Sequence, residues 1–337
     1  MHVAMSSRSM HGGVTVGLLG GRQQGRLRPH WMDAELPRVP NRLLNAVVFI
    51  YATVEDAYAG RSAGGTGFLV SVPFETDNKY AHLYLVTNSH VVKRSPSLAI
   101  RFNTPSGTTE IFEVSRDQWC HHPNGDDVAA IPLDLDSATY ELSDVPVEIF
   151  MTETQRTNGD FGTGDECFVI GRNIGLEGER TNTPAARFGA VSIMSPEPIY
   201  QPGRKHAQDS IVVEAKSLGG YSGAPTFVYQ APPILEPIRG GMERWPVVVH
   251  SYSQSGFAML GITWGHMNGR IAVVGPGSDL SESEKAVAVN SGMMLVVPAW
   301  KIRQLLDLES LADRRETQER EHHEKVGRTR AGIDSES

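Results

Sequence analysis

The chain has 337 residues, 40% of them hydrophobic and 21% charged, which is ordinary for a globular protein with a sizeable core. Its net charge of −8 argues against nucleic acid or an anionic membrane as the main partner, because both bind to surfaces on which Lys and Arg cluster. Two cysteines, Cys120 and Cys167, exclude a disulfide scaffold and leave room for one bridge at most. We expect two free, buried thiols in a reducing compartment.

The first 40 residues are rich in Gly, Arg, Ser and His and show little periodicity, so we expect a disordered extension over residues 1–40. Met32 is a plausible start of its own, and we hypothesise that residues 1–31 lie outside the folded unit and are not translated. Residues 14–21 are too short to span a membrane, and no clear cleavage site follows them. We therefore expect a cytoplasmic protein, with secretion as the less favoured alternative.

From residue 41 onward the pattern is that of a β protein. Short runs rich in Val, Ile, Phe and Tyr recur between Gly, Pro, Asn and Asp, and many such strands with few long helical patterns favour a sandwich or barrels. The runs predict strands at residues 47–54, 66–72, 82–87, 98–102, 111–114, 128–132, 166–170, 190–193, 210–214, 225–228, 245–250, 258–264 and 292–297.

One helix closes the β pattern. It begins after Pro298 and places Ile302, Leu305 and Leu306 on one face. Residues 308–337 are dense in charge and almost free of apolar side chains, so we expect a solvated helix followed by a floppy tail. The two histidines of this tail, His322 and His323, need no metal to explain them.

The strongest chemical signal is the segment 219–225 (GGYSGAP). A serine hydroxyl becomes a useful nucleophile only beside a base and with donors for the oxyanion that forms. Small residues around Ser222 allow a sharp turn and the close approach of a carbonyl carbon. The N–H groups of Gly220 and Ser222 would then point into one oxyanion hole. A plain glycine-rich turn is the alternative interpretation.

Two further segments supply a base and an acid. His90 follows a strand in residues 84–92 (YLVTNSHVV), and Asp127 directly precedes an apolar strand in residues 125–132 (GDDVAAIP). Each alone has a plainer explanation, a structural histidine or a turn at the start of a strand. Together with Ser222 they follow the order His, Asp, Ser of one known kind of catalytic triad. Asp126 is a competing acid, and we favour Asp127 because the strand begins directly after it.

These segments resemble the trypsin-like (chymotrypsin-fold) serine peptidase superfamily, and most of all its bacterial HtrA-like and cytosolic branch. The similarity covers about residues 43–307, with Ala224 where a glycine is usual, and the tail does not resemble a PDZ domain. Further similar segments are residues 65–70 (GTGFLV), 164–171 (GDECFVIG), 261–265 (GITWG) and 297–302 (VPAWKI).

The resemblance implies an all-β fold of two six-stranded antiparallel β-barrels with a C-terminal helix. Residues 41–150 would form the first barrel, 151–307 the second barrel and closing helix, and 308–337 a charged tail. It implies a serine endopeptidase that needs no cofactor or metal and acts on a protein or peptide substrate, through an acyl-enzyme on Ser222. His90 would be the base, and Asp127 would orient it.

The resemblance also points to residues that would bind substrate. Thr263, Trp264 and Gly265 would lie on the strand that pairs with the substrate backbone. Lys216 would line the specificity pocket and favour acidic side chains, with a solvated lysine as the alternative, and residues 232–246 would form an enlarged hairpin or loop beside the cleft. Tyr221 stands where digestive members carry an aspartate that pairs with a freed N-terminus, so we do not expect activation by N-terminal cleavage.

The sequence gives less support to other functions. An α/β-hydrolase needs a helix after its serine and would place its His and Asp later in the chain, whereas Pro225 opens an apolar strand. A metal site at Cys120, His121 and His122 is disfavoured because adjacent ligands point apart on a strand. Scattered glycines in residues 17–25 lack the context of a phosphate site. The serious alternative is a binding or sensor module whose protease activity is weak or lost.

Overall fold

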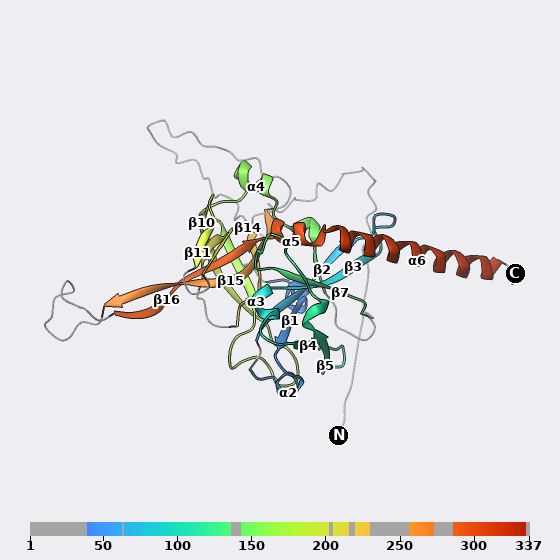
Figure 1. Ribbon diagram of the computed structural model, residues 1–337, viewed down its shortest axis with the longest axis horizontal. Coiled ribbons are helices and arrows are strands. Elements are labelled where there is room, and N and C mark those ends of the chain that lie inside the picture. The colour runs from blue at the N-terminus through green and yellow to red at the C-terminus, as the bar shows by residue number, and fades with distance from the viewer. Residues whose placement is uncertain are drawn as a thin grey trace, which may run out of the picture. The chain divides into compact units, whose positions relative to one another are not determined.

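The computed structural model describes residues 39–62, 64–135, 143–201, 205–215, 220–229, 256–272 and 286–334 (Figure 1). All of the described residues belong to one compact unit, which begins at Val39. The predicted extension up to residue 38, the strand at 245–250 and the loop at 232–246 lie outside the described residues.

The first half of the compact unit is a sheet of eight strands. Its order is β5-β4-β1-β2-β3-β7-β6, with β8 pairing β2. The elements are α1 (Asn41–Asn45), β1 (Val47–Tyr51), α2 (Val54–Ala59), β2 (Gly65–Pro73), β3 (Ala81–Thr87), α3 (Ser89–Val92), β4 (Ser97–Asn103), β5 (Thr109–Ser115), η2 (Arg116–Gln118), β6 (Cys120–His121), β7 (Ala129–Leu133), β8 (Val145–Pro146) and η3 (Val147–Ile149). All pairs are antiparallel except β2 with β8.

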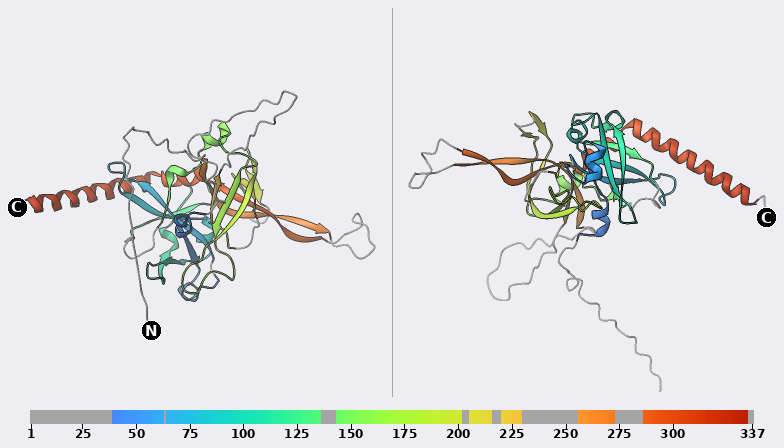
Figure 2. Two further views of the ribbon diagram at one scale, coloured as in Figure 1. Left: turned by 180° about the vertical axis from the view of Figure 1, so that it is seen from behind. Right: turned by 90° about the horizontal axis from the view of Figure 1, so that it is seen from below.

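The second half is a closed barrel of six strands in the order β10-β13-β16-β15-β14-β9. Its elements are α4 (Glu153–Asn158), β9 (Glu166–Gly171), β10 (Ala185–Met194), β11 (Ile199–Gln201), β12 (His206–Gln208), β13 (Ile211–Glu214), β14 (Pro225–Tyr229), β15 (Phe257–Ala272) and β16 (Ala286–Pro298). β11 and β12 form a separate two-stranded sheet. β15 and β16 stay paired as far as Ala272 and Ala286, and Figures 1 and 2 show them running past the barrel as a ribbon.

The predicted fold class is therefore confirmed, with one difference. The second barrel has the expected six strands, whereas the first half is an eight-stranded sheet that is not closed by hydrogen bonds among the described residues. The two additional strands, β6 and β8, are two residues long and leave no hydrophobic pattern in the sequence. The predicted strand at residues 47–54 is also too long, because Val54 begins α2.

Two helices follow the last strand, α5 (Ala299–Leu306) and α6 (Glu309–Asp334). α5 begins after Pro298 and buries Ile302, Leu305 and Leu306, as its spacing predicts. No helix in the described part of the chain combines the length and the apolar character needed to cross a membrane.

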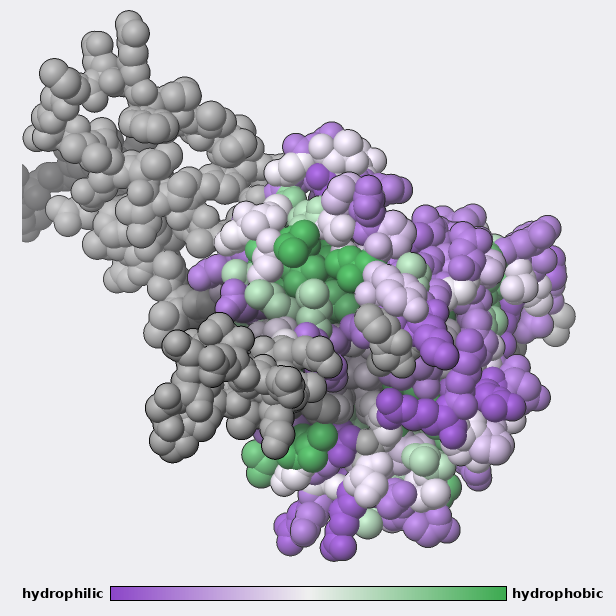
Figure 3. All heavy atoms as spheres, turned by 60° about the vertical axis from the view of Figure 1, so that its left-hand side comes forward, coloured by the Kyte–Doolittle hydropathy of each residue, from purple (hydrophilic) through white to green (hydrophobic). Residues whose placement is uncertain are grey.

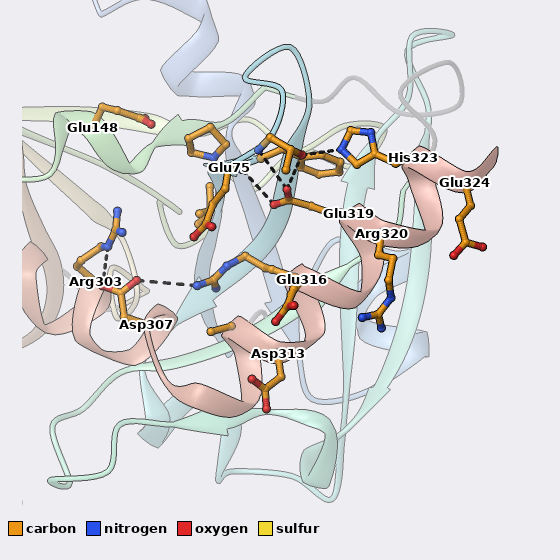
Figure 4. Close-up of a pocket in the computed structure, with 16 residues that line it drawn as sticks. Glu75, Glu148, Arg303, Asp307, Asp313, Glu316, Glu319, Arg320, His323 and Glu324 are labelled. Atoms are coloured by element: carbon orange, nitrogen blue, oxygen red, sulfur yellow. Dashed lines mark hydrogen bonds and ion pairs between the residues drawn. The ribbon is translucent and has the colours of Figure 1, made fainter. Parts of the chain in front are cut away.

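The expectation of a fully solvated α6 is wrong for its first half. Glu319 is only 6% exposed, and Figure 4 shows it directed at the connection between β2 and β3. It accepts hydrogen bonds from the Glu75 N–H (3.1 Å) and the Thr76 hydroxyl (2.8 Å), and it lies 3.1 Å from His82 Nε2. His323 Nε2 lies 2.6 Å from the same Thr76 hydroxyl. These polar contacts, together with Leu311, which is buried in the core, dock the helix beside a cavity of about 920 Å³.

Candidate active site

His90 and Asp127 meet where the first sheet ends. His90 lies in α3, the single helical turn that follows β3, and Asp127 lies just before β7. One carboxylate oxygen accepts the backbone N–H of His90 at 2.9 Å, and the other lies 2.6 Å from Nδ1 of its imidazole. Because a carboxylate only accepts hydrogen bonds, the proton of a neutral imidazole sits on Nδ1, and Nε2 is left as the basic atom.

The backbone around Asp127 is held from two sides. Asn88 donates from its amide to the Asp127 carbonyl at 2.8 Å, and the Asp127 N–H donates to Oε1 of Gln208 at 2.8 Å. Ser89 donates to the next carbonyl, that of Val128, at 2.8 Å. These contacts fix the carboxylate relative to α3, since Asn88 and Ser89 are the two residues directly before His90.

Asp126 faces other partners. Its carboxylate lies 3.0 Å from His122 Nδ1 and 3.2 Å from Lys301 Nζ, and it accepts from the Gln208 amide at 2.6 Å. Burial alone raises the pKa of this carboxyl, but the bonds to His122 and Lys301 bring it down to about 2. The structure thus brings Asp127 to His90 and places Asp126 in a separate ion-pair network with the closing helix α5.

Ser222 lies in a tight turn between Gly220 and β14, and its side chain is half-buried. The turn needs glycine at both ends, with φ of +95° at Gly220 and +84° at Gly223. It is tied to the second barrel by the Gly223 N–H, which donates to the Thr263 carbonyl at 2.8 Å, and to the first sheet by the Thr66 N–H, which donates to the Ser222 carbonyl at 2.8 Å.

A second observation brings the serine turn to the histidine. A Cβ built on Gly65 would lie 2.8 Å from the side chain of Val91 and 3.2 Å from the carbonyl oxygen of Ser222. Val91 directly follows His90, so the serine and the histidine segments lie on either side of one glycine. A hydrogen bond from the Ser222 hydroxyl to Nε2 of His90 stays a prediction, and such bonds are often long in ligand-free sites.

Tyr221 fills the place next to the serine. Its ring is buried, and its hydroxyl accepts a hydrogen bond of 2.7 Å from Nε of Arg187. The guanidinium carbon of Arg187 also lies 4.8 Å from the ring centroid, within the range of a cation–π contact. Burial raises the pKa of Tyr221, and the hydrogen bond from Arg187 offsets only part of this rise, so the side chain stays a neutral phenol.

The residues predicted to bind substrate have different surroundings. Both backbone polar groups of Thr263 bond to the serine turn. Its carbonyl accepts from the Gly223 N–H, and its N–H donates to the Ala224 carbonyl. Trp264 is fully buried and donates from its indole to Ser210 at 3.0 Å, so its side chain cannot reach a substrate. Gly265 is half-buried, and a backbone role for it stays a prediction. Lys216 lies outside the described residues.

Two surface features involve residues near Ser222 in the sequence or in the fold. Ala215, the last described residue before the serine turn, lines a shallow cavity of about 410 Å³ with Phe188 and Gly292. Ile174 is 57% exposed, and its Cγ1 would lie 3.4 Å from a Cβ on Gly220. Other large apolar side chains are exposed as well, and Figure 3 shows hydrophobic areas between hydrophilic ones on the face turned forward.

The two cysteines and His121 have other surroundings than the proposed triad. Cys120 and Cys167 are both free thiols, Cys120 half-buried and Cys167 buried, and burial raises the pKa of Cys167 to about 12. His121 lies 2.9 Å from the Ser89 hydroxyl. Within the described ranges, no group of three His, Cys, Asp or Glu side chains is arranged to hold a metal ion.

Sequence reasoning missed three residues that organise the site: Thr66, Arg187 and Gln208. Thr66 lies in a segment that carries the family resemblance, but its bonding partners are far away in the chain. Arg187 lies in β10 and Gln208 at the end of β12, and no local pattern marks either residue.

Comparison with known proteins agrees with this fold. The family model of the trypsin-like peptidase domain matches residues 65–231, which include all three predicted triad residues. Residues 65–231 are therefore a domain of the trypsin-like peptidase family. A search of curated proteins finds no match.

Three solved structures are similar at low sequence identity. The MamO protease domain from Magnetospirillum magneticum is 17% identical, with a TM-score of 0.44, over 78% of this chain and 96% of that one. The HtrA-type protease AlgW with a decapeptide is 16% identical, with a TM-score of 0.42, over 80% and 66%. Human heparin binding protein is 10% identical, with a TM-score of 0.42, over 80% and 93%.

Proposed function

We propose that this protein is a serine endopeptidase in which Ser222 is the nucleophile, His90 the general base and Asp127 the residue that orients the base. The observation that carries the proposal is the double contact of Asp127 with His90, at 2.9 Å to the backbone N–H and 2.6 Å to Nδ1. One carboxylate thereby fixes both the position and the tautomer of the imidazole. A structural histidine needs no such arrangement beside a serine on a glycine-flanked turn.

The proposed reaction has two steps. Nε2 of His90 takes the hydroxyl proton of Ser222 as the oxygen attacks the peptide carbonyl, and the amine then leaves with a proton returned by the imidazolium. Water hydrolyses the acyl-enzyme with His90 again as base. Asp127 stabilises the imidazolium, and the N–H groups of Gly220 and Ser222 stabilise the oxyanion. This chemistry uses side chains and backbone alone.

A fluorophosphonate probe tests the proposal, because it phosphonylates only an activated serine. We expect the purified full-length chain to be labelled once, at Ser222, and Ser222→Ala to remain unlabelled. Ser97→Ala is the matched control, since Ser97 lies on β4 and its hydroxyl donates to Glu113; this variant should label like the wild type. Cleavage of a peptide library by the same preparation then defines the substrate.

A folded wild type that neither labels nor cleaves would reject the proposal in favour of the alternative, a binding or sensor module. The proposal also covers the partner and the location of the protein. We propose a protein or peptide as the partner, with neither nucleic acid nor membrane involved, and a cytoplasmic location, which the two free thiols support.

A further inference from the structure

Thr66 makes four hydrogen bonds at the seam between the two halves of the fold. It lies near the start of β2 and is completely buried. Its N–H donates to the Ser222 carbonyl (2.8 Å), and its own carbonyl accepts from the Thr87 hydroxyl (2.7 Å). Its hydroxyl donates to the Gly220 carbonyl (2.8 Å) and accepts from the Arg172 N–H (3.2 Å). One residue therefore links the serine turn to the strand that leads to His90.

The hydroxyl has its direction set by these partners. A backbone N–H can only donate and a carbonyl can only accept, so the N–H of Arg172 uses an acceptor site of the threonine oxygen and the single proton goes to Gly220. Threonine also has a stiff χ1 angle, because its Cβ is branched. The donor is therefore fixed before any substrate arrives.

Gly220 is the residue of the turn that most needs such a restraint. It has no Cβ and sits at φ +95°, so its backbone has alternative conformations of similar energy. The next two carbonyls are also held, that of Tyr221 by the Ala224 N–H at 2.9 Å and that of Ser222 by the Thr66 N–H. Since each peptide unit is planar, the held Tyr221 carbonyl fixes the N–H of Ser222. The Gly220 carbonyl lies on the other side of the Gly220 Cα from its N–H, so holding this carbonyl restrains the rotation about Gly220 that sets the direction of the N–H.

We infer that the Thr66 hydroxyl is a positioning group for the oxyanion hole: it keeps Gly220 in the conformation that directs the Gly220 N–H at the oxyanion. This rests on the proposed function. Thr66 does not touch the substrate; it acts through the peptide groups of Gly220 and Ser222. Its loss should therefore slow the chemical step and leave ground-state binding unchanged.

The test compares Thr66→Val with Thr66→Ser in the full-length chain. Valine keeps the shape and both backbone bonds but removes the hydroxyl, whereas serine keeps the hydroxyl. We expect Thr66→Val to lower kcat by about 10- to 100-fold with KM within about twofold, somewhat less than the loss of an oxyanion donor itself. Thr66→Ser should stay within about threefold of the wild type.

Thr104→Val is the control for losing a buried threonine hydroxyl. Thr104 is 6% exposed, and its hydroxyl bonds Ser106 and Thr108 in the turn between β4 and β5. Its kcat should match the wild type. If Thr66→Val does not fold, Thr66→Cys takes its place, because cysteine differs from serine only in its thiol, a weaker donor than the hydroxyl, and it should lie between the serine variant and complete loss of the donor.

Two outcomes would overturn the inference: wild-type kcat in Thr66→Val, or equal losses in Thr66→Ser and Thr66→Val. A wild type that does not react with a fluorophosphonate refutes the proposed function instead. In that case, NMR relaxation dispersion of the Gly220 amide still decides the role of Thr66. Exchange should appear in Thr66→Val and be absent from the wild type and Thr66→Ser, and its absence from all three would overturn the inference.

Discussion

Arg187 holds Tyr221 from β10, with its Nε 2.7 Å from the phenol oxygen and its guanidinium over the ring. Tyr221 directly precedes Ser222, so this pair anchors the serine turn to the second barrel. In digestive relatives an aspartate at this place pairs with a new N-terminus, as the family resemblance implies. Here the partner is a side chain of the folded barrel and needs no cleavage to form.

The first prediction is that the protein does not depend on N-terminal processing. A chain carrying an N-terminal tag should react with a fluorophosphonate at the same rate as the chain after tag removal, because Tyr221 already has Arg187 as its partner within the fold. Arg187→Met should slow this reaction by about tenfold, since the serine turn loses its anchor. A large rise in rate on tag removal would contradict this account.

The second prediction separates the two neighbouring acids. Asp127→Asn should lower kcat by about 10⁴-fold, as loss of the correct imidazole tautomer does in this kind of triad, with nearly unchanged stability. Asp126→Asn should leave kcat within about threefold but lower the free energy of unfolding by about 1–3 kcal/mol, because His122 and Lys301 lose a charged partner. Peptide hydrolysis and urea unfolding of both variants measure this, and the reverse pattern would reassign the triad acid.

The choice between these acids shows what sequence reasoning can reach. The apolar run after Asp127 favours it over Asp126, and Asp127 lies 2.6 Å from His90 Nδ1; its role as the triad acid stays a prediction. Local patterns likewise predict the longer strands and α5, because burial repeats along one segment, whereas the short strands β6, β8, β11 and β12 carry no such pattern. By contrast, Thr66 meets Gly220 across 154 residues and Glu319 meets His82 across 237. No pattern within either segment specifies its distant partner, so the serine-turn restraint and the docking of α6 became visible only in the fold.

The third prediction concerns stability at low pH. The pKa of Asp126 is about 2 in the folded protein, because the bonds to His122 and Lys301 outweigh the rise caused by burial, and about 3.9 in an unfolded chain. A folded pKa below the unfolded one means that the carboxylate stabilises the fold fully above about pH 4 and loses this effect as the pH falls towards 2. The contribution is roughly 2 kcal/mol.

Urea unfolding at pH 6, 4 and 3 measures this effect. The difference in unfolding free energy between the wild type and Asp126→Asn should shrink as the pH falls. A difference that stays constant over this range would show that the Asp126 carboxylate is not the group responsible.

The fourth prediction tests the docking of α6. Glu319→Ala removes the acceptor for Glu75, Thr76 and His82, and should lower the free energy of unfolding by about 1–3 kcal/mol. Amide hydrogen exchange in residues 309–324 should become faster. Glu321→Ala is the control, because Glu321 is exposed on the same helix. Equal protection in both variants would mean that Glu319 does not hold the helix.

The last prediction compares two glycines that share a backbone conformation and differ in their surroundings. Gly223 (φ +84°) directly follows the serine, and an added Cβ would lie 2.0 Å from the Thr66 carbonyl oxygen and 2.4 Å from the Thr87 hydroxyl. Gly107 (φ +76°) has nothing within 4 Å of the same position.

Gly107→Ala should therefore cost only the strain of a left-handed alanine, about 1–2 kcal/mol, and keep wild-type labelling. Gly223→Ala must also push the serine turn away from β2, so it should abolish fluorophosphonate labelling. If both variants labelled alike, the close packing of the serine turn against Thr66 would not be what holds Ser222 in place.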